Sequence, residues 1–325
     1  MTSVPSVCNQ LYILGRRRNQ IIKRQRLINQ PAEQQFVFEI TLALEDSKDL
    51  SKKELYENAQ RLRNLMLKHV SPTWDEVIAI SRDASEENYT KFIDRLQQES
   101  GVEPKLWEIT VILEQIFTVI ADQAILKTFD RDRKNLEDVM ESLAEELPVF
   151  AWWNSNRGCA ALGLAKIVAE TGNLSNYANP GKVWKRMGMA PYKDKAASTW
   201  KKTPNALTAD EWVDLGYVAR RRSVMYVIGD VLVKMGDIYR KVFLDRKRIE
   251  AKTMIARGMV LVASAKTIAD SWEAQGLPRP VTLKNGEFDN KKHVSVGYVN
   301  LRAQRYMEKR LLKDLWIEWQ KVLPS

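Results

Sequence analysis

An apolar stripe with helical spacing, in the middle of the chain, constrains the fold more than any other sequence feature. Large aliphatic residues recur every three or four positions from Leu106 to Ile120. The same spacing resumes after the charged stretch DRDRK and continues from Leu136 to Leu147. Apolar residues at this period form one face of an amphipathic helix. A stripe this long predicts a bundle core or a coiled-coil seam, and we expect a homo-oligomer associated through this helical middle.

The remainder of the chain also shows helical patterning. We expect Pro31 to interrupt the N-terminal helices, because its ring disfavours a helix interior. A short hairpin over 281–288 is predicted to turn at Asn285-Gly286. The predicted helices cover 10–29, 32–44, 160–171, 180–186, 212–243, 249–272 and 299–322, with loops over 191–208 and 276–292. The predicted class is all-α, an elongated helical or coiled-coil N-terminal region followed by a helical domain that contains a helix-hairpin-helix.

Charge is unevenly distributed along the chain, which carries a net charge of +10. Residues 1–30 hold six Lys and Arg and no acid, residues 31–150 hold 14 against 25 Asp and Glu, and residues 151–250 hold 18 against nine. Basic regions that flank an acidic one suggest a nucleic-acid surface, and solvated basic helix faces are the alternative. The predicted segments are a basic N-terminal helix 1–30, an acidic helical region 31–148, a helix-hairpin-helix domain 149–275, and a loop with the C-terminal helix 276–325.

Several classes of protein are excluded by simple absences. No uncharged apolar run approaches the roughly 18–20 residues of a membrane helix. The N-terminal apolar residues precede the basic cluster at 16–18, the reverse of a signal peptide, so we expect a cytoplasmic protein with no membrane partner. Cys8 and Cys159 are the only cysteines, His69 and His293 the only histidines, and none has metal-ligand spacing. No metal and no other cofactor is predicted.

The segment from Arg157 to Pro191, RGCAALGLAKIVAETGNLSNYANPGKVWKRMGMAP, places two short helical patterns around glycine-bearing turns. A hairpin of this kind can direct backbone N–H groups at a phosphate oxygen. Glycine permits the close approach that such a contact requires. Phosphate contacts anchor a protein on DNA without reading its sequence. The pattern predicts a phosphate contact at Arg157 and Gly158, and helix packing is the alternative reading of the same glycines.

This segment resembles the helix-hairpin-helix portion of the insertion-sequence transposases that pair an N-terminal RuvC-like DEDD nuclease domain with a C-terminal serine-bearing domain. The matching positions are Gly158, Ala169–Gly172, Tyr177 and Gly188–Pro191, and the similarity is best over about residues 150–265. The second hairpin glycine of that family is Ala160 here. The resemblance implies a DNA-binding protein of a mobile genetic element, with roles in DNA recombination and transposition.

The resemblance also implies a candidate nucleophile. In the family a serine in the following loop attacks DNA, and Ser198 is the nearest counterpart. Lys195, Lys201 and Lys202 surround it and would favour a nearby phosphate. No base or metal stands beside it in sequence to activate the hydroxyl, so an ordinary loop serine is the alternative. No segment upstream of residue 30 could form the sheet of the family's nuclease domain. We therefore expect no autonomous metal-dependent catalysis.

A helix with three consecutive arginines, 220–222, resembles the arginine-rich helix that follows this loop in the family. Three consecutive residues span most of a helical turn, so we expect at least two of them to reach solvent or a phosphate. Some tryptophans are candidates for base stacking, although core packing is their usual role: Trp152, Trp153, Trp184 and Trp200. The predicted nucleic-acid-binding residues are Arg157, Gly158, Lys182, Lys185, Arg186, Lys195, Lys201, Lys202, Arg220, Arg221 and Arg222.

Three hypotheses for the function follow from these patterns. The first is a DNA-binding protein that resembles the C-terminal part of such a transposase and lacks its own nuclease domain. The second is an active recombinase subunit that uses Ser198 together with a partner nuclease chain. The third is a structured-RNA-binding or assembly protein, because basic helices do not by themselves distinguish DNA from RNA.

Overall fold

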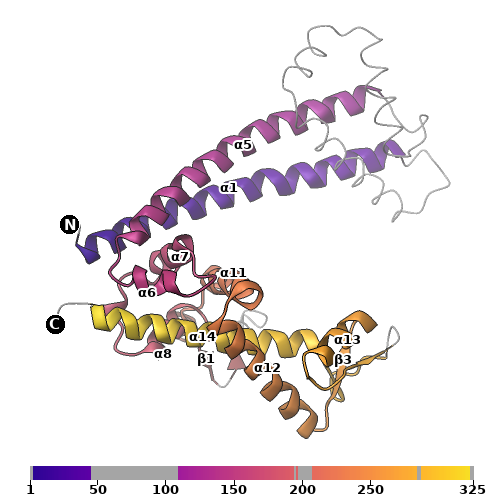
Figure 1. Cartoon of the computed structure of the whole chain (residues 1–325). Helices are drawn as coiled ribbons and strands as arrows, with labels where there is room; N and C mark the ends of the chain where they lie inside the picture. The colour runs from indigo at the N-terminus through magenta and orange to yellow at the C-terminus, as the bar shows by residue number, and fades with distance from the viewer. Residues whose placement is uncertain (1–2, 45–108, 194, 197–206, 284–286, 323–325) are drawn as a thin grey trace. The chain divides into compact units, whose positions relative to one another are not determined.

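A computed structural model describes residues 3–44, 109–193, 195–196, 207–283 and 287–322 (Figure 1). The described residues are mostly helical, which confirms the predicted all-α class. The α-helices are α1 Val4–Leu44, α5 Ile109–Glu145, α6 Phe150–Ser155, α7 Ala161–Thr171, α8 Pro180–Arg186, α10 Ala209–Leu215, α11 Ala219–Met235, α12 Ile238–Ala256, α13 Lys266–Ala274 and α14 Val296–Val322, and a 3₁₀ turn, η2, covers Leu174–Asn176.

Five short strands accompany these helices within the described residues. The strands β1 (Pro191–Tyr192) and β2 (Lys195–Ala196) pair antiparallel, inside the segment expected to be a loop. A second sheet has the order β4-β3-β5, with both pairings parallel. Its strands are β3 Val260–Ala263, β4 Val281–Thr282 and β5 His293–Ser295.

The chain forms two compact units. Residues 1–16 and 137–325 make one unit, and residues 17–136 make the other. The unit boundaries therefore do not coincide with the segment boundaries at 30, 148 and 275 expected from the sequence. In the unit 17–136, α1 and α5 lie side by side. Gln25 on α1 donates a hydrogen bond of 2.9 Å to Asp130 on α5.

The predicted interruption of the N-terminal helix is wrong. Helix α1 passes through Pro31 without a break, which costs the one backbone hydrogen bond that proline cannot donate. Helix α5 likewise runs straight through the charged stretch 130–134. The apolar stripe expected from Leu106 to Ile120 lies outside the residues whose side chains are described, so a coiled-coil seam there stays a prediction.

The main core lies in the unit formed by 1–16 and 137–325. Its largest fully buried side chains include Trp153 on α6 and Trp319 on α14, with exposures of 0% and 1%. The first turns of α1 contribute Val7 and Leu11, and the end of α5 contributes Met140. Helix α14 packs against α8, η2, α11 and α12. This long C-terminal helix is thus the element on which the others assemble.

Tryptophan N–H groups fix the segment after α7 to helix α14. The indole of Trp316 donates to the Tyr177 carbonyl at 2.9 Å, and that of Trp319 donates to the Asn173 side chain at 3.0 Å. In the opposite direction, Trp184 on α8 donates to the Lys309 carbonyl at 3.0 Å. A buried indole needs such a partner for its N–H. These bonds set the position of residues 173–184, which line the site described below.

A smaller core surrounds the parallel sheet, and it corrects the prediction for residues 249–272. A single helix was expected there, but α12 ends at Ala256 and Gly258, with a φ of +77°, turns the chain into β3. Glycine tolerates this left-handed conformation, and Val260–Ala263 then suits a strand because β-branched residues favour that geometry. Strand β4 pairs with β3 rather than forming the hairpin expected over 281–288, whose Asn285-Gly286 turn lies outside the described residues.

Helices α11 and α14 meet at a buried carboxyl group. Glu308 is 3% exposed, and Gln304 donates to its carboxyl at 2.9 Å. A Cβ added at Gly229 on α11 would lie 2.4 Å from that carboxyl oxygen. Burial raises the pKa of Glu308 to about 8, against the opposing influence of Arg222 and Arg305. The carboxyl group is therefore mostly protonated at neutral pH and below.

The close contact between helices α1 and α7 should require glycine at position 15, where no side chain separates them. A Cβ at Gly15 would lie 2.6 Å from the Cβ of Ala169, too close for two helices to keep their contact. We expect Gly15→Ala to lower the free energy of unfolding by about 1–3 kcal/mol, as overpacking does, in urea unfolding. Gly297→Ala is the matched control, because a Cβ there meets only the Ser295 hydroxyl at 3.9 Å. Equal stability of both variants and the parent would contradict the close packing.

Glu308 should make stability depend on pH. Between its ordinary pKa of 4.5 and about 8, the folded protein holds a proton that the unfolded chain releases, so the free energy of unfolding falls as pH rises through this window. Each pKa unit corresponds to about 1.4 kcal/mol. Urea unfolding of Glu308→Gln at about pH 5 and about pH 8 should show a flatter dependence than the parent. Glu145→Gln, at an exposed position of α5, should keep the parent's dependence, and a Glu308→Gln profile parallel to the parent's would refute this role.

Candidate nucleic-acid interface

The site is built by the turn between α7 and α8, by α8 itself, by the end of α10 and by the start of α11. Helix α7 ends at Thr171 because Gly172, with a φ of +74°, reverses the chain. Asn179 caps α8 by accepting from the Lys182 backbone N–H, and Pro180 occupies the first helical position. The chain therefore folds back on itself, and the end of α8 comes to lie beside the end of α7.

Glu170, near the end of α7, is the anchor of the site. It is 6% exposed. Its carboxylate accepts hydrogen bonds from Arg220 at 2.9 and 3.2 Å and from Arg221 at 3.4 Å. Its backbone carbonyl accepts from the Arg186 Nε at 2.9 Å. One buried residue thus fixes three arginines from two helices, and charge-assisted bonds of this kind are among the stronger ones in proteins.

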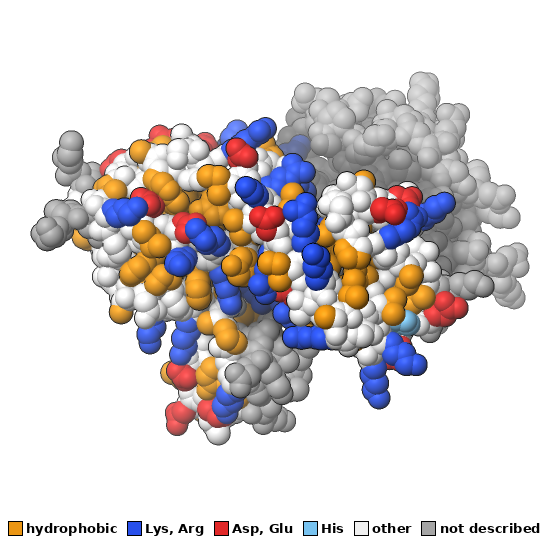
Figure 2. Space-filling model, turned by 60° about the horizontal axis from the view of Figure 1, so that its bottom comes forward, with side chains coloured by type: hydrophobic (Ala, Val, Ile, Leu, Met, Phe, Trp, Pro, Cys, Tyr) orange, Lys and Arg blue, Asp and Glu red, His pale blue; other side chains and the backbone are white. Residues whose placement is uncertain are grey.

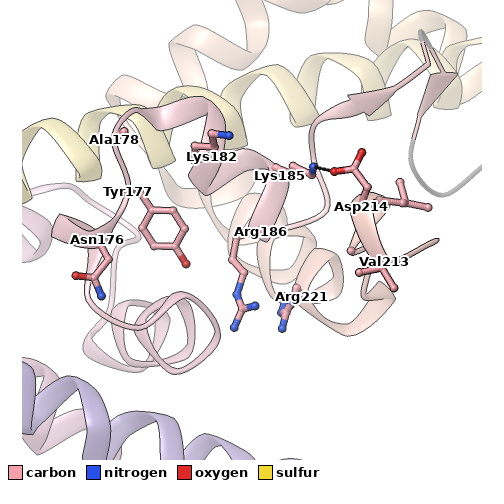
Figure 3. Close-up of a pocket in the computed structure, with 11 residues that line it drawn as sticks. Asn176, Tyr177, Ala178, Lys182, Lys185, Arg186, Val213, Asp214 and Arg221 are labelled. Carbon is pink, nitrogen blue, oxygen red and sulfur yellow. Dashed lines mark hydrogen bonds and ion pairs between the residues drawn. The ribbon is translucent and has the colours of Figure 1, made fainter. Parts of the chain in front are cut away.

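Arg186 and Arg221, two of the side chains held by Glu170, border an open pocket of about 450 Å³ (Figure 3). In the close-up, Arg186 and Arg221 extend in the same direction, and the Tyr177 hydroxyl lies on their side of the pocket. The lining residues are Asn176, Tyr177, Ala178, Lys182, Lys185, Arg186, Val213, Asp214, Leu215, Gly216 and Arg221.

The lining is strongly positive. The lining holds four cations and only one carboxylate. The carboxylate is Asp214, and the cations are Lys182, Lys185, Arg186 and Arg221. Lys185 pairs with Asp214 at 2.7 Å across the mouth, where both side chains are exposed. Such a surface pair is weak and leaves Lys185 able to exchange partners. The pocket therefore attracts anions.

Like charges lie close together inside this pocket. The pKa of Arg221 is lowered, first by burial and then by the positive charge of Arg186, while Glu170 opposes both. Arginine nevertheless stays protonated. Burial raises the pKa of Tyr177, and its hydroxyl donates to the Thr171 carbonyl at 2.6 Å. An anion between the two guanidinium groups would offset their mutual repulsion.

The predicted hairpin residues lie elsewhere. Arg157 is exposed, and neither it nor Gly158 lines the pocket. Gly158 has a φ of +90°, and a Cβ there would lie 3.2 Å from Leu232 and 3.6 Å from the Gly236 nitrogen. The glycine thus allows the hairpin to pack closely on α11, which is the packing alternative named from the sequence.

The three consecutive arginines divide between two places. Arg220 and Arg221 bind Glu170, whereas Arg222 lies near α14, where its charge lowers the pKa of Arg305 after the larger effect of burial. Arg222 and Arg305 also lower the pKa of Lys309, again after burial. We call Arg222, Arg305 and Lys309 the α14 cluster. The Lys309 ammonium lies 5.5 Å from the ring centre of Trp184, so that half-buried ring packs beneath the cluster.

The candidate nucleophile lies outside the described residues, as do Lys201, Lys202 and Trp200. Lys195 is placed in β2, although its side chain is not described. The role of Ser198 as a nucleophile therefore stays a prediction. Of the other tryptophans, Trp153 is fully buried and Trp152 is half-buried beside it, with ring centres 6.5 Å apart.

Sequence reasoning missed the roles of Glu170, Tyr177 and Asp214. In the sequence, Glu170 and Tyr177 stand out only as positions that match the resembled family. A usable signal existed for Glu170, because it is the one acid in the apolar helix ALGLAKIVAET. An acid on a buried helix is rarely left without a cationic partner, and the arginine-rich helix supplies that partner.

Other kinds of site find no support in the described part of the chain. It holds no group of three or more metal-ligating side chains, and no helix there is long and apolar enough to cross a membrane. Cys8 and Cys159 are buried thiols, and burial raises their pKa values to about 11 and about 12.

Comparison with known proteins adds no assignment: no family model, curated protein or solved structure matches this chain.

Removing the Glu170 carboxylate should loosen the site and the fold together. In Glu170→Gln, Arg220 and Arg221 lose a charged acceptor next to a buried position, and we expect the free energy of unfolding to fall by about 1–3 kcal/mol. Asp214→Asn is the matched control, since its pair with Lys185 is exposed and should not affect urea unfolding measurably. If both variants unfold like the parent, Glu170 is not the anchor described.

Proposed function

We propose that this chain binds DNA through the pocket and the α14 cluster, as a protein that resembles the C-terminal part of an insertion-sequence transposase without a metal-dependent nuclease domain of its own. The observation that carries the proposal is the pocket of Lys182, Lys185, Arg186 and Arg221, whose arginines are fixed in advance by Glu170. Prefixed guanidinium groups suit phosphate because less side-chain freedom is lost on binding.

The surrounding surface supports the same function. The α14 cluster adds three cations to those of the pocket, and α11 contributes a residue to both, Arg221 to the pocket and Arg222 to the cluster. Figure 2 shows Lys and Arg side chains spread over the visible face of the molecule, with hydrophobic side chains between them. Phosphate contacts from such a surface supply sequence-independent affinity that falls with salt.

Salt-dependent binding of the full chain to a fluorescent duplex tests the proposal. Each lost phosphate contact lowers the slope of log affinity against log salt by about 0.9. We expect the double variant Lys182→Gln, Lys185→Gln to weaken binding and to reduce the slope by about 1–2 between about 50 and 200 mM salt. Both lysines are exposed at the pocket mouth, so the fold should be unaffected.

The control is Lys291→Gln with Lys292→Gln, two exposed lysines in the turn before β5, which should bind like the parent. Binding that does not vary with salt, or equal losses in both double variants, would contradict the proposal. If structured RNA displaces the duplex at equimolar amounts, the RNA-binding alternative replaces DNA binding.

A further inference from the structure

The pocket is larger than a phosphate contact requires. Its volume of about 450 Å³ lies within the range of small-molecule sites, about 300–1,000 Å³. A phosphate group held by Arg186 and Arg221 would fill only part of that space. The remaining volume leaves room for a group that is attached to the phosphate.

The chemistry of the lining changes across the pocket. Cations line it at Lys182, Arg186 and Arg221, whereas Ala178, Val213 and Leu215 present apolar surface. Val213 is 81% exposed, so its side chain is accessible to a ligand in the pocket. Figure 3 places Val213 on the other side of the pocket from Tyr177. An anionic group joined to a flat, largely apolar one matches this division.

The charge of the pocket indicates which kind of phosphate it prefers. Of the four lining cations, Asp214 balances one and Glu170 beneath the pocket balances part of another. Between two and three positive charges therefore remain on the lining. A terminal phosphate monoester carries about −1.5 to −2 at neutral pH, while an internal diester carries only one negative charge. The monoester is thus the better match, and its extra oxygen can engage both guanidinium groups.

We propose that this pocket binds a nucleoside 5′-monophosphate, with the phosphate between Arg186 and Arg221 and the nucleoside against Val213 and Leu215. The ligand is either a free nucleotide or the phosphorylated 5′ end of a DNA strand. The second source rests on the proposed DNA-binding function, whereas the first is independent of it.

Two binding series on the full chain test the assignment and separate the sources. Calorimetry compares dAMP, deoxyadenosine and inorganic phosphate. Fluorescence anisotropy compares duplexes with a one-nucleotide 5′ overhang that ends in phosphate or in hydroxyl. We expect dAMP to bind roughly tenfold more tightly than inorganic phosphate, because inorganic phosphate lacks the apolar contact of the nucleoside. We expect the phosphorylated end to bind roughly tenfold more tightly than the hydroxyl end, as the loss of one charge-assisted contact would predict.

Pocket variants assign these differences to the proposed groups. Arg221→Lys keeps the charge but loses the planar fork, and it should reduce the phosphate-end preference to within about twofold. Val213→Ser should weaken dAMP while leaving inorganic phosphate unchanged, because the exposed Val213 contacts only the nucleoside part. If Arg221→Lys fails to fold, Lys182→Gln, at an exposed position, serves in its place.

The outcomes are distinguishable. Equal affinity for dAMP and inorganic phosphate, together with equal affinity for both duplex ends, overturns the inference, and salt-dependent duplex binding would still stand. Preference for dAMP without a preference between duplex ends supports a free nucleotide as the source. Preference for the phosphorylated end that Arg221→Lys abolishes supports the strand end. Absence of duplex binding at low salt overturns the proposed function but leaves the dAMP result to decide the pocket ligand.

Discussion

The buried carboxylate of Glu170 is the interaction on which the candidate site depends. It joins α7 to α11 through Arg220 and Arg221, and its backbone carbonyl joins the same residue to Arg186 on α8. Without this acceptor, the guanidinium groups of Arg186 and Arg221, which repel each other, would share a small, partly buried space. With it, they are held in place before any ligand arrives. The stability of this region and the fixed positions of its guanidinium groups are therefore two results of one interaction.

Helix α14 gives that arrangement a rigid support. Its indole N–H groups hold the segment around Asn173 and Tyr177, and its Lys309 carbonyl holds Trp184 of α8. The same helix carries Arg305 and Lys309 of the α14 cluster. Because the cations and the core contacts come from one set of helices, the basic surface is an extension of the core rather than a separate attachment. Function proposed for the surface is thus tied to the packing beneath it.

The sequence was sufficient to predict the helical class, because three-to-four periodicity is a local property that survives in the folded protein. It also included Lys182, Lys185, Arg186 and Arg221 among the eleven predicted nucleic-acid-binding residues, since their charge is visible without a structure. It did not indicate that Glu170 holds the arginines, because pairing across 50 residues is a tertiary property. Local rules also failed at Pro31, where the long helix tolerates one missing bond, and at Val260–Ala263, where sheet pairing prevails over helical spacing.

The most direct test of the account is a crystal structure of the full chain with a duplex that carries a 5′-phosphorylated overhang. The account predicts a phosphate within hydrogen-bond distance of the guanidinium groups of Arg186 and Arg221, with the bonds from Arg220 and Arg221 to Glu170 intact. DNA bound elsewhere on the protein, with those two guanidinium groups making no contact to any phosphate, would contradict it.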